Sequence, residues 1–131
     1  MSADYPEDLR YTKDHEWARI RGNVAQIGIT RFAVEQLGDV TQLELPREGE
    51  SVKKDEVFGT IESVKTLSDL FAPVSGTVEK INADLEAAPE RVNEDCWDKG
   101  WMIVIHADDP KAVDALLEAK SYSEHIASLE H

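Results

Sequence analysis

The sequence has few of the features that mark disulfide-rich, membrane or nucleic-acid-binding proteins. Its one cysteine, Cys96, has no partner for an internal disulfide, so we expect a reducing, cytoplasmic compartment. No apolar run approaches the roughly 20 residues that a membrane helix needs, and the N-terminus lacks a basic-then-apolar signal pattern. The 14 Lys and Arg stand against 27 Asp and Glu, and a net charge of −13 argues against phosphate binding. We therefore expect a soluble protein whose partners are proteins, with no nucleic acid and no membrane.

The length of the chain indicates a single domain. A domain of 131 residues buries roughly two-thirds of the surface that its unfolded form exposes, which suffices for a core without disulfide or metal staples. We predict one domain over residues 1–128. The last residues, Leu-Glu-His at 129–131, look like a cloning site followed by a tag histidine, and we assign them to an expression-tag remnant.

Alternation of apolar and polar residues predicts several short strands. Residues 9–29 predict a hairpin with its turn at 21–23, and residues 40–45 predict a strand that Pro46 ends. The polar segment 48–56 predicts a turn region. The apolar run 101–105 is short and β-branched, which is typical of a buried strand.

Capping residues predict three helices. Thr30 precedes a helix over residues 31–37 that Gly38 ends, and Asn82 is the predicted cap of a brief helix over 83–86. Asp109 and Pro110 predict the start of a C-terminal helix, with apolar positions at 113, 116 and 117 facing the sheet. Short strands with small helices indicate a mainly β fold, a sandwich or flattened barrel with peripheral helices.

Lys65 lies where a hairpin is expected to turn. Residues 57–61 and 69–78 both have the pattern of strands, so Glu62-Ser63-Val64-Lys65-Thr66 forms the connection between them. A lysine carried on a tight, sheet-supported turn is better suited to serve as an attachment point than as a catalyst.

The same segment is one of several ordered sequence blocks between about Leu9 and Tyr122. The blocks are residues 11–17 (YTKDHEW), 28–30 (GIT), 36–40 (QLGDV), 44–46 (ELP), 59–65 (GTIESVK), 68–69 (SD), 72–76 (APVSG) and 92–93 (VN). In this order they resemble the glycine cleavage system H protein family, with H-like lipoate-binding proteins included. The resemblance implies a lipoyl/biotinyl-type flattened barrel-sandwich of two antiparallel sheets, and makes residues 1–128 a lipoyl-carrier domain.

The resemblance assigns a role to Lys65 and its neighbours. It implies that lipoic acid is attached to Lys65 as N6-lipoyl-lysine, and that Glu62 and Asp69 contribute to recognition by a lipoyl ligase or octanoyltransferase. Biotin carriers typically have methionines on both sides of the modified lysine, whereas this chain has Val64 and Thr66.

The resemblance also implies a cleft that shelters the loaded arm, meaning the lysine with its lipoyl group and cargo. Glu16 is the expected carboxylate that pairs with a cationic cargo, and Gln36 and Asp69 are further candidates for the same cleft. Arg31 stands where the family usually has an acidic residue, so it is expected to place a positive charge at this cleft.

The function implied by the resemblance is that of a shuttle without catalytic groups of its own. The arm takes an aminomethyl group from glycine decarboxylase (P protein) to the aminomethyltransferase (T protein), and dihydrolipoyl dehydrogenase (L protein) reoxidises it. Because Arg31 departs from the family pattern, an alternative is an H-like lipoate-binding protein of a heterodisulfide-reductase-like sulfur-oxidation system. An alternative of another class is a binding scaffold in which Lys65 stays unmodified.

Histidine and cysteine give little support to an enzyme. His15 has no second histidine at metal-ligand spacing, and His106 and His125 stand alone in the sequence, so a structural or surface role is expected for each. Cys96 is expected to be an ordinary buried or half-buried residue. No metal site is predicted.

Overall fold

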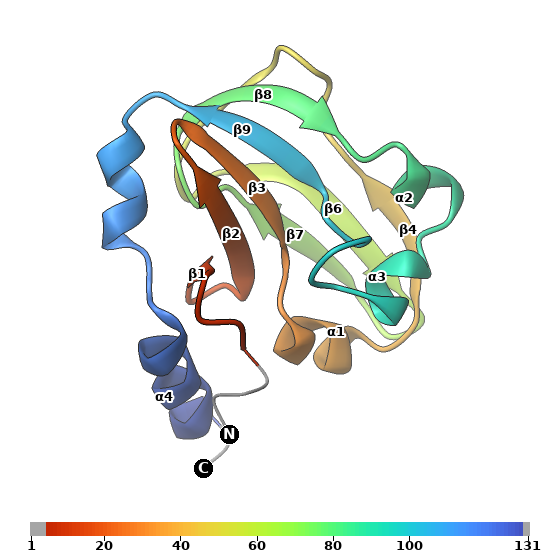
Figure 1. Ribbon diagram of the computed structural model, residues 1–131. Helices are drawn as coiled ribbons and strands as arrows, with labels where there is room; N and C mark the ends of the chain where they lie inside the picture. Colours follow the sequence, from red (N-terminus) through yellow and green to blue (C-terminus); the bar gives the residue numbers. More distant parts are fainter. Residues whose placement is uncertain (1–4, 130–131) are drawn as a thin grey trace.

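A computed structural model describes residues 5–129, which form two antiparallel sheets stacked face to face (Figure 1). The larger sheet has the strand order β1-β2-β3-β9-β8-β5 and the smaller one the order β4-β6-β7. The strands of the larger sheet are β1 (Arg10–Tyr11), β2 (Glu16–Arg21), β3 (Val24–Ile29), β5 (Ser51–Val52), β8 (Gly76–Ile81) and β9 (Ile103–Ala107). Those of the smaller sheet are β4 (Val40–Glu44), β6 (Val57–Ser63) and β7 (Leu67–Phe71). The predicted sandwich of two antiparallel sheets is confirmed.

The N-terminal hairpin and the helix that follows it agree with the sequence prediction. Strands β2 and β3 pair from Arg21 with Val24 to Glu16 with Ile29, leaving a two-residue turn. Helix α1 (Arg31–Leu37) begins at Thr30, whose hydroxyl accepts the backbone N–H of Ala33. Gly38 ends the helix with a φ of 77°, a left-handed backbone angle that glycine adopts at low cost. Helix α1 thereby carries the chain from the larger sheet to β4 of the smaller one.

The segment predicted as one strand over residues 69–78 is two strands in different sheets. Strand β7 pairs with β6 in the smaller sheet, whereas β8 pairs with β9 and β5 in the larger sheet. The buried residues Ala72, Pro73 and Val74 lie between them, where the chain changes sheets. Proline has no N–H to donate to a ladder, so it suits this break. The short strand β5, within the segment predicted as a turn region, was not foreseen.

Two one-turn helices lie between β8 and β9, and only one is predicted by the sequence. Helix α2 (Asp84–Ala87) falls at the predicted place, but the side chain of Asn82 does not cap it. Instead, the Asn82 amide donates to the carbonyls of Lys99 and Trp101 and so ties the loop before β9. Helix α3 (Arg91–Glu94) was missed, because four residues carry no periodic apolar signal.

The C-terminal region differs from the prediction of one helix that begins at Asp109. Asp109 caps a 3-10 segment, η2 (Pro110–Ala115), and helix α4 (Ala119–Leu129) begins only after a bridge between Leu117 and Tyr11. The backbone pairs Leu117 with β1 in both directions, which stops the helix and turns the chain. Helix α4 then lies beside β1, on the same side of the molecule as α1 (Figure 1).

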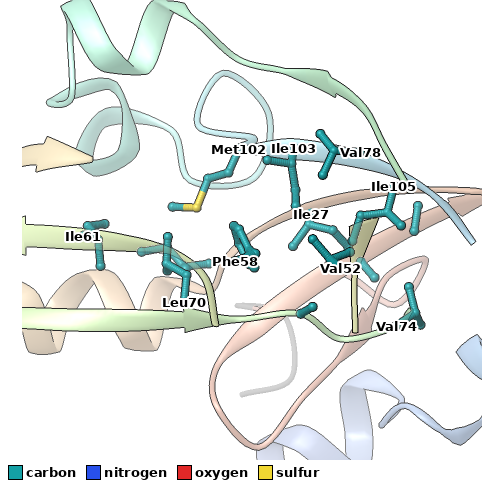
Figure 2. Close-up of a cluster of buried hydrophobic side chains, with 14 of the residues drawn as sticks. Ile27, Val52, Phe58, Ile61, Leu70, Val74, Val78, Met102, Ile103 and Ile105 are labelled. Atoms are coloured by element: carbon teal, nitrogen blue, oxygen red, sulfur yellow. The ribbon is translucent and has the colours of Figure 1, made fainter. Parts of the chain in front are cut away.

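The core lies between the two sheets. Figure 2 shows Ile103 and Ile105 of the larger sheet, with Met102 just before β9, on the side facing Phe58, Ile61 and Leu70 of the smaller sheet. Burial of each such side chain contributes roughly 1.5–3 kcal/mol. A second cluster packs α4 on the outside of β1 and β2. Its buried members are Leu9, Tyr11, Trp17, Ala119, Tyr122 and Ile126.

Gly28 makes room for the largest buried side chain. It pairs with Trp17 across β2 and β3, and a Cβ built at Gly28 would lie 2.5 Å from Cζ2 of the indole. The indole Nε1 donates to the carbonyl of Cys96 at 2.9 Å, which anchors the loop after α3.

Across residues 5–129, no helix has both the length and the apolar character needed to cross a bilayer.

Candidate functional site

The tip of the β6–β7 hairpin, which we call the Lys65 tip (residues 63–66), is shaped by Ser63. The Ser63 Oγ accepts the backbone N–H groups of Lys65 at 3.1 Å and of Thr66 at 3.2 Å, and the Ser63 N–H donates to the Thr66 carbonyl at 2.8 Å. Ser63 is buried while Lys65 is exposed. Serine thus closes the turn locally, as expected for serine at a turn, and the lysine projects from it.

The loop between α1 and β4 contacts the Lys65 tip and supports it. The Val64 N–H donates to the Asp39 carbonyl at 3.0 Å. Asn93 holds this loop from both sides, because its Oδ1 accepts the Val40 N–H and its Nδ2 donates to the Gly38 carbonyl, each at 2.8 Å. A Cβ built at Gly38 would lie 3.3 Å from Cε of Lys65, so the lysine stem runs over the end of α1.

The surface around Lys65 combines apolar and acidic groups. Val64 and Leu67, on either side of the lysine, are 67% and 63% exposed, the largest exposures among the large hydrophobic side chains of residues 5–129. Glu62 and Asp69 are also exposed, on β6 and β7. Asp69 lines the cleft described next, whereas Glu62 lies on the outer face of the smaller sheet beside Gln42 and Thr60.

A cleft of about 600 Å³ opens beside the Lys65 tip. Its walls come from five parts of the chain: the β1–β2 loop with the start of β2, the end of β3, one face of α1, the hairpin β6–β7, and the end of α4. We call it the arm cleft. It is lined by Asp14, His15, Glu16, Ile29, Phe32, Ala33, Gln36, Leu37, Ile61, Thr66, Ser68, Asp69, Leu70 and Leu129.

Helix periodicity decides which residues of α1 line the arm cleft. Positions 32, 33, 36 and 37 lie on the cleft face, as their spacing of three and four residues requires. Gln36 therefore lines the cleft. Arg31 is not: it is exposed and shares the opposite face with Glu35, where its charge acts on Cys96. The positive charge expected at the cleft is absent from its described lining.

Glu16 is a buried acid in the wall of the arm cleft. It is 2% exposed, its Oε1 accepts the Thr12 hydroxyl at 2.7 Å, and its Oε2 accepts the Phe71 N–H at 3.3 Å. Burial raises the pKa of Glu16 to about 8, against these two hydrogen bonds, which lower it. The carboxyl therefore holds its proton at neutral pH more readily than an ordinary glutamic acid, and a cation close to it would favour its ionised form.

His15 precedes Glu16 and is connected to α4 by a hydrogen bond. Its Nδ1 lies 2.8 Å from the Tyr122 hydroxyl, which is also 2.7 Å from Oγ1 of Thr30, the N-cap of α1. The ring centroids of His15 and His125 are 6.1 Å apart, so His125 is isolated in the sequence but not in the structure. Burial and then His125 lower the pKa of His15, against Asp14, which raises it.

The remaining candidates for chemistry are structural. Burial raises the pKa of the Cys96 thiol to about 11, which keeps it protonated and unreactive at neutral pH. Cys96 is buried, within the range that the sequence predicted. In the described part of the chain, no group of three or more His, Cys, Asp or Glu side chains is placed to hold a metal ion.

Sequence reasoning missed several residues that line or support the arm cleft. Thr12 supports it through its hydrogen bond to Glu16, and Thr30 and Tyr122 through their hydrogen bond to each other across 92 positions. Phe32 lines the cleft, and the only sequence signal for it is the helical face that it shares with Gln36. Leu129, assigned by the sequence to a tag remnant, ends α4 and lines the cleft. The origin of residues 129–131 stays a prediction, and positions 130 and 131 lie outside the described residues.

A two-sheet sandwich that presents a lysine on a hairpin tip, beside a cleft with a buried acid, defines a carrier domain of the lipoyl type. The family model described as "Glycine cleavage H-protein" matches residues 9–129. A relative named "Glycine cleavage system H protein" from Anaeromyxobacter sp. (strain K) is 51% identical over 127 residues, covering 97% of this chain and 99% of its own length. One of the same name from Bacillus subtilis (strain 168) is 49% identical over 119 residues, covering 91% and 94%.

A solved structure agrees with these sequence matches. The crystal structure of a glycine cleavage system H protein from Mycobacterium marinum superimposes with a TM-score of 0.86 at 38% identity, over 93% of this chain and 98% of that one. The chain therefore belongs to the glycine cleavage H-protein family, the carrier proteins of glycine cleavage. The fold predicted from the resemblance is confirmed.

Proposed function

We propose that this chain is a lipoyl carrier of glycine cleavage in which Lys65 holds lipoic acid as N6-lipoyl-lysine. The observation that supports the proposal is the position of Lys65, exposed on a turn that Ser63 closes, with its stem over Gly38 and with Thr66 already in the wall of the arm cleft. When bound, the lipoyl group supplies a dithiolane whose sulfurs accept and release the cargo. The lysine amide supplies only the attachment.

The residues of the arm cleft fit such a group. Apolar walls from Ile29, Phe32 and Leu70 suit a hydrocarbon chain, and Glu16 supplies a carboxyl group for a cationic amine. Glu16 gives up its proton when a cation arrives, because an opposite charge at close range favours the ionised acid. Gln36 and Asp69 add polar atoms to the same cleft.

The partners follow from the family and from the charge of the chain. We assign the delivery of the aminomethyl group to glycine decarboxylase, its removal to the aminomethyltransferase, and reoxidation to dihydrolipoyl dehydrogenase, with a lipoyl ligase or octanoyltransferase attaching the arm in the cytoplasm. The chain itself acts as a non-catalytic component. Its net charge of −13 favours encounters with basic surfaces around the partners' active sites. Among the acidic residues, exposed Glu62 and Asp69 are the nearest in sequence to Lys65.

Reconstitution tests the proposal. Protein treated with a lipoyl ligase and lipoic acid should gain the mass of one lipoyl group, at Lys65. With glycine decarboxylase, pyridoxal phosphate and glycine it should then gain the mass of one aminomethyl group. An unmodified Lys65 would leave the scaffold alternative, whereas a lipoylated chain that accepts sulfur but no aminomethyl group would favour the sulfur-oxidation alternative. The position of Arg31, outside the described lining of the cleft, supports the glycine reading.

A further inference from the structure

One hydroxyl group connects three walls of the arm cleft. The Tyr122 hydroxyl, on α4, lies 2.7 Å from Oγ1 of Thr30 and 2.8 Å from Nδ1 of His15. Thr30 caps α1, which provides the helical wall, and its own N–H donates to the His15 carbonyl at 2.9 Å. His15 lines the cleft and directly precedes Glu16.

The third wall is α4 itself. Tyr122 and Leu129 are seven residues apart, two helical turns, and so lie on the same face of α4. Leu129 lines the arm cleft, while Tyr122 is fully buried and bonds to the other two walls through its hydroxyl. Thr30 is fully buried as well, and its hydroxyl also accepts the Ala33 N–H, so removal of the Tyr122 hydroxyl would take away one of these two hydrogen bonds out of reach of bulk water.

We propose that Tyr122 is a positioning residue of the arm cleft: its hydroxyl fixes α1, the β1–β2 loop and α4 relative to one another, and so keeps Glu16 in place to face the arm that Lys65 carries. The inference rests on the proposed function. It assigns to the C-terminal helix a task besides core packing, namely to keep water from the loaded arm.

Tyr11 offers a matched control in the same cluster. Its ring stacks on that of Tyr122 with centroids 4.7 Å apart, both rings are fully buried, and each phenol makes hydrogen bonds. The Tyr11 hydroxyl, however, donates to the Pro6 carbonyl at 2.6 Å, whereas the Tyr122 hydroxyl bonds to Thr30 and His15 at the cleft walls. Tyr122→Phe and Tyr11→Phe therefore remove the same atom from the same aromatic stack, and only the first affects the cleft walls.

The first measurement uses the unmodified protein. In Tyr122→Phe, amide hydrogen exchange over α1 and at residues 15–16 should be about fivefold faster or more than in the wild type, as expected when the two hydrogen bonds of this hydroxyl are lost. In Tyr11→Phe it should change less than about twofold at the same amides. Equal acceleration in both variants, or none in either, would overturn the proposal.

The second measurement uses lipoylated protein that carries the aminomethyl group, without the transferase. Tyr122→Phe should lose its cargo to water about three- to tenfold faster than wild type and Tyr11→Phe at the wild-type rate, with equal lipoylation of all three. Thr30→Ser, which keeps the hydroxyl, should behave as wild type, and Thr30→Val should follow Tyr122→Phe. Equal cargo lifetimes in all variants would refute the positioning role. A wild type that accepts no cargo would refute the proposed function, and hydrogen exchange would still decide whether Tyr122 orders the cleft.

Discussion

The Lys65 tip and the arm cleft lie side by side, yet different contacts hold them. At the tip, the Ser63 hydroxyl reaches N–H groups two and three residues away. In the cleft, Glu16 is bonded to a backbone N–H 55 positions away, and His15 to a hydroxyl 107 positions away. Lys65 is exposed, as the proposed attachment requires, whereas Glu16 is 2% exposed. In the proposed function, attachment needs access and protection needs exclusion of water, and the two regions would divide these tasks.

The largest expected effect is at the tip. Lys65→Arg should abolish lipoylation completely, because a guanidinium group does not form the amide, and with it all cargo transfer. Its free energy of unfolding should stay within about 0.5 kcal/mol of wild type, since the side chain is exposed. Intact mass after ligase treatment, with Lys80→Arg on β8 as control, gives the result. Any lipoylation of Lys65→Arg would show that the attachment point lies elsewhere.

The cleft is tested by Glu16→Gln, which keeps the size of the side chain and removes its charge. Lipoylation should be unchanged, while the aminomethyl cargo should be lost to water about tenfold faster or more, because hydrogen bonds to charged groups contribute about 1.5–3 kcal/mol. Glu79→Gln, at an exposed position on β8, is the control. The ratio of wild-type to Glu16→Gln lifetimes should rise from pH 6 to pH 8 as Glu16 ionises. A ratio of one at every pH would exclude Glu16 from the cleft's chemistry.

The buried acid should also make stability depend on pH. The pKa of Glu16 is about 8 in the fold and 4.5 as its ordinary value, so the folded state holds the proton more tightly than the unfolded state. This contribution is complete below pH 4.5 and is lost as pH rises through 8, on the order of a few kcal/mol. Urea unfolding of wild type and Glu16→Gln at pH 5 and pH 8 should show the wild type losing more stability. Parallel losses in the two proteins would contradict a raised pKa.

The support beneath the tip gives a smaller effect. Asn93→Ala removes hydrogen bonds to Gly38 and Val40 and should destabilise the fold by about 1–3 kcal/mol. Lipoylation should slow but persist, because Ser63 still closes the turn. Thermal unfolding and the initial rate of ligase modification are the measurements, with exposed Glu94→Ala as control. If Asn93→Ala had the stability and the initial modification rate of the wild type, the α1–β4 loop would support the tip without Asn93.

The smallest effect on stability is expected at the apolar flank of the lysine. Val64→Ser should change the free energy of unfolding by less than about 0.5 kcal/mol, because the side chain is 67% exposed. If partners contact this surface, the KM for the ligase should rise while kcat stays the same. Thr41→Ser, at another exposed site on the smaller sheet, should leave both constants unchanged. A fall in stability above 1 kcal/mol would show that Val64 is packed rather than presented.

The sequence alone determined features that depend on neighbouring residues. Thr30 and Gly38 set the ends of α1, alternation sets the strands, and the turn that carries Lys65 follows from residues 62–66. These signals are local, because caps and turns bond within three or four positions. Where a local signal competed with a distant contact it failed: Asp109 caps a 3-10 turn, and the pairing of Leu117 with Tyr11 delays the helix to residue 119.

Only the tertiary structure decided which residues surround the arm cleft. Arg31 and Phe32 are adjacent in the sequence, but the packing of α1 places Phe32 in the wall of the cleft and Arg31 outside it. His15 and Tyr122 meet across 107 positions, and that contact has no signature in either segment. The proposed anchor of this carrier is thus encoded in a short stretch of sequence, whereas its cleft, with the raised pKa of Glu16, exists only when distant segments pack and exclude water.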